Sequence, residues 1–225
     1  MAERIVAINP RCRVLCVESF VTRENAAALL SRSLSEHGGY DMLIDAIDNV
    51  DDKAAILKAC ADTATPVLTV GAAGGRLDPT TVRVGDAATV TGDALLARLR
   101  RKLRQRYGFP YGSPTSSAAD APWNIPAVHS VEPPPAPSPA AASGGAGCRV
   151  EAGGMRPCDS AYGSSCMATA AFGLAAASAA VAAVLRGPRA GNAPRVEIAG
   201  ERVRVKPRAP PVDPVPPPAV RVTAR

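Results

Sequence analysis

The chain has 225 residues, a formal net charge of +6 and a hydrophobic content of 47%. This length accommodates one α/β domain with appendages, and the apolar content excludes a wholly disordered protein. Basic residues are concentrated in the segment 98–106 and the tail 186–225, whereas residues 1–97 carry a net negative charge. We therefore expect an acidic body with one basic helix and one basic tail.

The cysteine and histidine content argues against a disulfide framework and against a zinc site. Six cysteines occur without any CxxC pair, and the chain has only two histidines. Paired cysteines or several histidines form the usual metal sites. No apolar segment of the signal-peptide kind opens the chain. We predict reduced thiols and a cytoplasmic protein, with an organelle as the alternative if a targeting sequence lies upstream of Met1.

The first part of the chain predicts three short elements. Residues 1–9 have the pattern of a helix end that Pro10 stops. Residues 13–18 predict a short strand, and residues 24–34 predict a helix with Thr22 as its N-cap.

Strands and helices then alternate. Apolar runs at 41–47 and 67–70 predict buried strands, the segment 51–63 predicts a helix between them, and residues 82–84 predict a further strand. This order is typical of a doubly wound parallel α/β sheet with helices on both faces. Ligands of such sheets bind beyond the carboxyl ends of the strands.

Two loops follow these strands and are candidate ligand sites. Asp45–Asn49 is acidic and polar, and Gly71–Gly75 is rich in glycine. Their shared position favours a binding site, although Asp48–Asn49 would also suit a simple helix cap and the glycines a tight turn. The glycine loop does not match a phosphate-binding P-loop, and no GxGxxG motif precedes residue 70.

The segment 93–106 predicts a helix with a stripe of leucines and a basic surround. No acidic residue follows Asp93 until Asp120, so opposite charges cannot pair within this helix. A run of charges is often only a solvated face, but uncompensated charge favours a polyanionic partner such as RNA. The basic residues are Arg98, Arg100, Arg101, Lys102, Arg104 and Arg106.

The second half of the chain contains fewer regular elements. Residues 125–131 predict a strand, and residues 133–147 predict a disordered insertion rich in Pro, Ala, Ser and Gly. Residues 167–185 carry no charge and are rich in alanine, which favours a buried helix over a membrane span. The tail 186–225 is expected to be disordered apart from a hairpin within 196–205.

Seven segments of the chain form a series that resembles one family. They are MAERIVAINPRCRV, ESFVTREN, YDMLIDAIDNVDDKAAILKAC, PVLTVGAAGGRLDPTTVRVGD, LLARLRRKLRQRYGF, IPAVHSVEP and CDSAYGSSCMATAAFGLAAASAAV. The DAIDN motif is general to the ThiF/MoeB/E1-like superfamily, and the glycine loop followed by LDPT is more specific. Together the segments resemble the bacterial tRNA threonylcarbamoyladenosine dehydratases. The resemblance implies a Rossmann-like, ThiF-type nucleotide-binding sheet.

The resemblance also implies a domain organisation. Residues 1–109 correspond to the C-terminal part of a ThiF-type domain, 110–150 to a loop and insertion, 151–185 to the family's C-terminal segment with an Ala-rich helix, and 186–225 to a basic Pro-rich tail. The family's opening strand and GxGGVGS loop lie upstream of Met1, so we expect an N-terminally truncated domain. Without those phosphate donors, we expect the chain alone to have no adenylating activity.

The family cyclises N6-threonylcarbamoyladenosine at position 37 of tRNA through an acyl-adenylate, using ATP and Mg²⁺, with overall loss of water. By resemblance, Asp48 is the catalytic aspartate that holds the metal, and Asn49 and Lys53 lie in the cofactor site. The substrate loop would comprise Gly71, Gly74 and Gly75. The basic helix would contact the tRNA backbone.

Cys158 matches the first cysteine of the family's CxSGFG segment, which here reads CDSAYG. It would be a catalytic thiol activated by the start of the following helix, or else a small buried residue. The resemblance further implies a homodimer and a cysteine-desulfurase or sulfur-acceptor system as partner.

Two other functions are kept open. A sulfur-carrier-protein adenylyltransferase of the MoeB kind would share the sheet, but the absence of CxxC pairs counts against it. A non-catalytic RNA-binding module would keep only the sheet and the basic helix.

Overall fold

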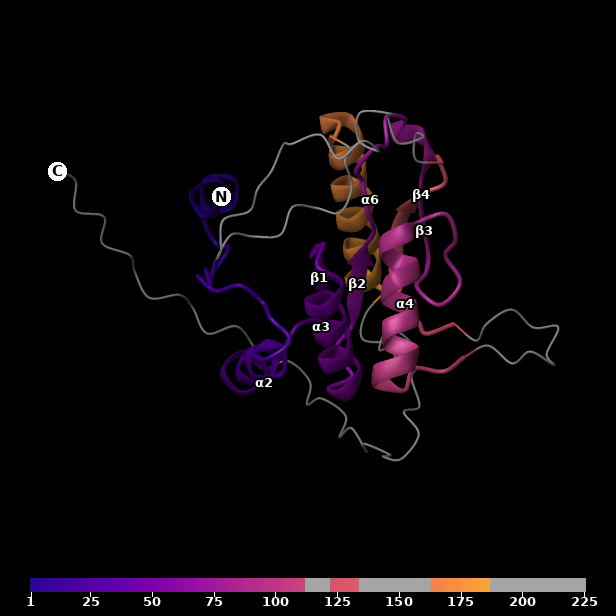
Figure 1. Cartoon of the computed structure of the whole chain (residues 1–225). Helices are drawn as coiled ribbons and strands as arrows, with labels where there is room; N and C mark the ends of the chain where they lie inside the picture. Colours follow the sequence, from indigo (N-terminus) through magenta and orange to yellow (C-terminus); the bar gives the residue numbers. More distant parts are fainter. Residues whose placement is uncertain (112–121, 134–162, 187–225) are drawn as a thin grey trace, which may run out of the picture.

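The structure is a computed structural model that describes residues 1–111, 122–133 and 163–186 (Figure 1). Its elements are α1 (Ala2–Ile8), α2 (Ala26–His37), β1 (Leu43–Asp45), α3 (Val50–Asp62), β2 (Val67–Val70), the 3-10 turn η1 (Pro79–Thr81), β3 (Val82–Asp86), α4 (Ala94–Tyr107), β4 (Pro126–Ser130) and α6 (Cys166–Leu185). The predicted insertion beyond residue 133, Cys158, and the tail with its predicted hairpin lie outside the described residues.

Four strands form one sheet in the order β1-β2-β4-β3. β1, β2 and β4 are parallel, whereas β3 is antiparallel to β4, with Val84 opposite Val128. The expectation of a wholly parallel sheet is therefore wrong for β3. The chain leaves β2 at its carboxyl end and reaches β3 without a crossover helix, so β3 starts at that same edge and runs back. One antiparallel edge strand is common in α/β sheets.

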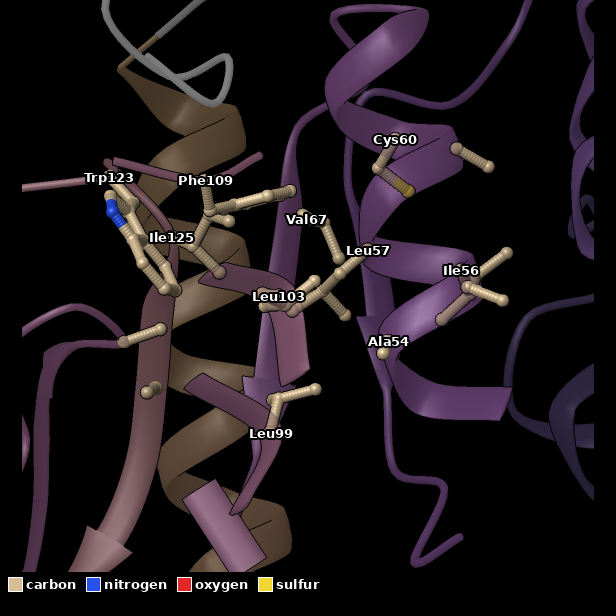
Figure 2. Packing of buried hydrophobic residues seen from close by; sticks show 14 of the residues in the cluster. Ala54, Ile56, Leu57, Cys60, Val67, Leu99, Leu103, Phe109, Trp123 and Ile125 are labelled. Carbon is tan, nitrogen blue, oxygen red and sulfur yellow. The ribbon is translucent and has the colours of Figure 1, made fainter. Parts of the chain in front are cut away.

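Helices cover both faces of the sheet, as expected for a Rossmann-like fold. α3 and α4 pack on one face with α2 beside α3, and α6 packs on the other (Figure 1). Figure 2 shows the larger core, in which Leu57 of α3 and Leu103 of α4 lie with Val67 of β2. The predicted leucine stripe of α4 is buried in this core. Phe109 and Trp123 close its end with an edge-to-face contact at 4.9 Å between ring centroids.

The first 25 residues differ most from expectation. Residues 13–18 form no strand and are mostly exposed, because no described strand lies beside them to complete a hydrogen-bond ladder. α1 buries none of its residues. The N-cap of α2 is Asn25 rather than the predicted Thr22. Thr22 contributes only its carbonyl oxygen, which accepts a hydrogen bond from the amide of Ala26 at 2.9 Å.

α6 is a core helix on one side only. By length and composition it is long and apolar enough to cross a membrane, but its inner stripe packs against the sheet, as in a core helix. That stripe comprises Ala168, Phe172, Ala176, Ala180 and Ala183. Leu174 and Leu185 lie outside it and are 72% and 80% exposed. The predicted burial is thus confirmed for one face of this helix.

Candidate active site

A buried ion pair fixes the carboxyl end of β1. Nζ of Lys53 lies 2.9 Å from Oδ2 of Asp45 and donates to the carbonyl oxygen of Ile47 at 2.8 Å. Oγ1 of Thr69 donates to the same carboxylate at 2.8 Å. Burial lowers the pKa of Lys53, and the Asp45 carboxylate opposes that shift. The pair connects α3 to β1 and β2. Because the Lys53 side chain is fully buried in this pair, the structure gives no geometric support to its predicted contact with a cofactor.

Asp48 and Asn49 follow β1 and are exposed at the start of α3. Oδ1 of Asn49 accepts from the backbone amides of Asp51 and Asp52 at 2.8 and 3.3 Å, so this residue is the helix cap. Asp48 is the exposed residue directly before this cap, at the end of α3 where the helix dipole favours a negative charge. Its exposure and its place beyond a parallel strand suit the role that was predicted for it.

Asp48 suits Mg²⁺ only together with a nucleotide. The described residues contain no cluster of three or more His, Cys, Asp or Glu side chains arranged around a common point. Magnesium is usually held by one or two carboxylates, with phosphate oxygens and water completing the octahedron. A single carboxylate therefore fits a metal that arrives with ATP and does not fit a metal held by protein alone.

The glycine loop begins in close contact with Asp93. The amide of Gly71 donates to the carbonyl oxygen of Val128 at 2.8 Å. Oδ2 of Asp93 accepts from the amide of Ala72 at 2.9 Å, while its Oδ1 caps α4 by accepting from Leu96 at 2.9 Å. Asp93 therefore joins the glycine loop to the basic helix.

The rest of the loop and the residues after it form a turn whose backbone amides donate to both backbone and side-chain oxygen atoms. Gly75 has φ +73°, a left-handed conformation that favours glycine, and its amide donates to the carbonyl oxygen of Gly163 at 3.0 Å. The amides of Leu77 and Asp78 both donate to Oε2 of Glu132 at 3.0 Å. This geometry is the tight turn that the sequence allowed as an alternative to a binding loop. A contact of Gly71, Gly74 and Gly75 with the substrate stays a prediction.

The six basic residues of α4 divide into two groups. Arg98, Arg101 and Arg106 are exposed, whereas Arg100, Lys102 and Arg104 are half-buried. The contact of these residues with RNA stays a prediction.

The half-buried group has partners within the fold. Arg100 donates to two backbone carbonyl oxygens of the loop before α4, at 2.7 and 3.2 Å. Lys102 pairs with Asp51 of α3 and lowers the pKa of that carboxyl. The guanidinium of Arg104 lies 5.4 Å from a ring centroid of Trp123. The expectation of uncompensated charge is therefore wrong for Lys102, whose counter-charge comes from another helix.

Three residues at this edge were not predicted as site residues. Asp93 precedes a helix and could have been found as an N-cap. Arg76 directly follows the glycine loop and is 3% exposed, and His129 lies near the end of β4 and is 8% exposed. Sequence patterns give no signal for their burial, because it depends on how the loop folds over the sheet.

Comparison with known proteins agrees with this architecture. The ThiF family model matches residues 1–204, and the chain belongs to the ThiF family. It is 38% identical over 182 residues to the tRNA threonylcarbamoyladenosine dehydratase of Escherichia coli, with 79% of this chain and 62% of that protein covered. It is 35% identical over 186 residues to the Haemophilus influenzae protein of the same name, and the match covers 83% of this chain and 64% of that protein. The resemblance predicted from sequence is confirmed.

Solved structures lead to the same family. The E. coli dehydratase in complex with ATP matches with a TM-score of 0.62 at 34% identity, covering 82% of this chain and 62% of that one. Its complex with AMP matches equally well. The chain thus spans less than two thirds of the length of these relatives.

Proposed function

We propose that this chain contributes to the ATP-dependent dehydration of N6-threonylcarbamoyladenosine in tRNA. The observation that carries the proposal is the exposed Asp48 carboxylate at the edge of the sheet from which the Gly71–Gly75 loop also leaves. The names of the relatives support the substrate, and the ATP complex of the E. coli protein supports the nucleotide. An adenylyltransferase of the MoeB kind has less support, because the relatives carry the dehydratase name.

Each part of the edge has a separate task in this proposal. Mg²⁺ bound with ATP would neutralise charge on the leaving pyrophosphate, and Asp48 would hold that metal. The Asp45–Lys53 pair keeps the end of β1 and the start of α3 rigid, so that the Asp48 carboxylate is held in place. Asn49 supports the same turn as the helix cap.

Arg98, Arg101 and Arg106 would contact the tRNA backbone. Their exposed guanidinium groups lie on one helix and suit phosphate contacts that do not read sequence. A tRNA substrate and bacterial relatives also favour a cytoplasmic location. Nothing among the described residues bears on the predicted sulfur-acceptor partner.

A homodimer formed through the outer face of α6 completes the proposal. Leu174, Val181 and Leu185 are large apolar side chains that are exposed on this helix. A groove of about 290 Å³, lined by Ile44 of β1, Val70 of β2 and Phe172 of α6 among others, lies between this helix and the sheet. Sedimentation of the variant Leu174→Glu/Val181→Glu, compared with Ser31→Glu/Ser35→Glu at exposed positions of α2, tests the interface. A wild-type chain that sediments as a monomer contradicts it.

The catalytic role is tested in a chimera. Residues 1–185 replace the matching segment of the E. coli dehydratase, and the nucleosides of treated tRNA are analysed by mass spectrometry for ATP-dependent loss of water. We expect the chimera to be active, Asp48→Ala to abolish activity, and Asp62→Ala to retain it. Asp62 is the matched control because it is an exposed carboxylate at the other end of α3. A folded but inactive chimera, or an active Asp48→Ala chimera, contradicts the proposal.

A further inference from the structure

Arg76 is a buried cation whose donors are largely unused. Its Nη2 donates to the carbonyl oxygen of Gly92 at 3.1 Å. Within the described ranges, its Nε and Nη1 have no hydrogen-bond partner, and no carboxylate forms an ion pair with it. The residue is only 3% exposed, so water does not replace these partners at the surface.

Such a guanidinium is unfavourable unless something compensates its charge. Arginine stays protonated at any physiological pH, so its charge cannot be removed by loss of a proton. Buried polar groups are nearly always hydrogen-bonded, and an unpaired group in a native fold needs an explanation such as a functional role or a bound ion. The unused Nε and Nη1 donors lie on different sides of the guanidinium, so each can donate separately to an oxygen atom of a carboxylate or phosphate.

The position of Arg76 relates it to the candidate active site. It follows the Gly71–Gly75 loop directly, and its amide donates to the carbonyl oxygen of Ala73 at 3.2 Å. Burial lowers the pKa of His129, and the charge of Arg76 adds to this shift; the Nδ1 atom of His129 also has no partner among the described residues. Both residues with unsatisfied groups belong to the carboxyl edge of the sheet, Arg76 after the glycine loop that follows β2 and His129 near the end of β4.

We propose that Arg76 receives an oxyanion of the substrate, either a carboxylate or a phosphate, at one of its unused donors, Nε or Nη1. The inference rests on the proposed function for the identity of the substrate. The guanidinium is covered, so the anion reaches it when residues 75–78 release their hydrogen bonds to Gly163 and Glu132. His129 would donate to or accept from the same group through Nδ1. The energetic cost of the unpaired cation is then offset in the bound state.

The test measures unfolding of the 225-residue chain at matched ionic strength in chloride, in inorganic phosphate and in N-acetylthreonine, which supplies a carboxylate. The variants are Arg76→Met, Arg76→Lys and, as control, Arg83→Met. Arg83 is a suitable control because it is an exposed cation that also acts on His129 and has carbonyl partners. The anion that raises the unfolding midpoint more strongly identifies the oxyanion.

We expect one anion to stabilise the wild-type chain and Arg83→Met equally. Arg76→Met should weaken the apparent affinity for that anion about tenfold, the effect of losing one or two charge-assisted hydrogen bonds. Arg76→Lys should retain part of the response, which keeps the test decisive if the methionine variant fails to fold. Equal responses of all variants, or no response of the wild type beyond chloride, would overturn the inference. Because no turnover is measured, this outcome is independent of the chimera assay.

Discussion

The carboxylate of Asp93 lies so close to Gly71 that a Cβ atom at Gly71 would be only 2.3 Å from Oδ2. The same Cβ would also lie 3.0 Å from the carbonyl oxygen of Val128. Because Asp93 is itself fixed as the cap of α4, its carboxylate cannot move away from Gly71 without loss of that cap. The contact therefore couples the start of the glycine loop to the basic helix.

The first prediction concerns this contact. Gly71→Ala should lower the free energy of unfolding by about 1–3 kcal/mol, because the added methyl group displaces either Asp93 or β4. Urea unfolding followed by circular dichroism measures the change. The control is Gly173→Ala in α6, where no atom lies within 4 Å of the new methyl group. In that helix, the higher helix propensity of alanine should raise the free energy of unfolding by about 0.5–1 kcal/mol. Equal changes in the free energy of unfolding at Gly71 and Gly173 would contradict our account.

The second prediction concerns the Asp45–Lys53 pair. Lys53→Met should destabilise the chain by about 3–5 kcal/mol, because it leaves the buried carboxylate without its cation. Lys58→Met is the matched control, since its partner Asp62 is a surface residue four positions away, and it should cost about 0–1 kcal/mol. The double variant Asp45→Asn/Lys53→Met should recover much of the loss. Failure to recover it would mean that Lys53 acts through packing rather than charge.

The third prediction separates the two groups of basic residues on α4. Replacing Arg98, Arg101 and Arg106 by Gln should weaken tRNA binding without loss of stability, and should reduce the slope of log affinity against log salt by about 2. Fluorescence anisotropy at several salt concentrations measures both. Replacing Arg4, Arg11 and Arg13, which are exposed near the N-terminus, removes the same charge and serves as control. A similar loss of tRNA affinity in both triple variants would show that binding depends on the net charge of the chain and not on the position of these arginines.

The fourth prediction is a pH dependence of stability. Burial lowers the pKa of His129 from its usual 6.5, Arg83 and Arg76 add to this effect, and Asp93 opposes it. The unfolded chain therefore binds this proton more readily, and stability should decrease as pH falls below about 6.5, by at most about 1.4 kcal/mol per pH unit. His129→Gln should remove the decrease, whereas His37→Gln on α2 should leave it. If the stability of His129→Gln has the same pH profile as that of the wild type, protonation of His129 is not the cause of the decrease.

Local patterns in the sequence determined much of this protein. The spacing of apolar residues predicted a helix over 51–63, where the structure has α3 over Val50–Asp62. It also predicted the strand at 67–70 and the inward leucines of the basic helix. These features depend on neighbours within a few residues, so a single chain contains the information. The ordered series of motifs likewise identified the family.

Only the tertiary structure decided which groups meet across the sheet edge. Lys102 pairs with Asp51 although the two are far apart in the sequence, and this pairing changes part of a presumed RNA-binding surface into a structural contact. The direction of β3, the burial of Lys53 and the unused donors of Arg76 depend equally on packing between distant segments. Burial and charge pairing are properties of three-dimensional neighbours, which periodicity along the chain does not encode.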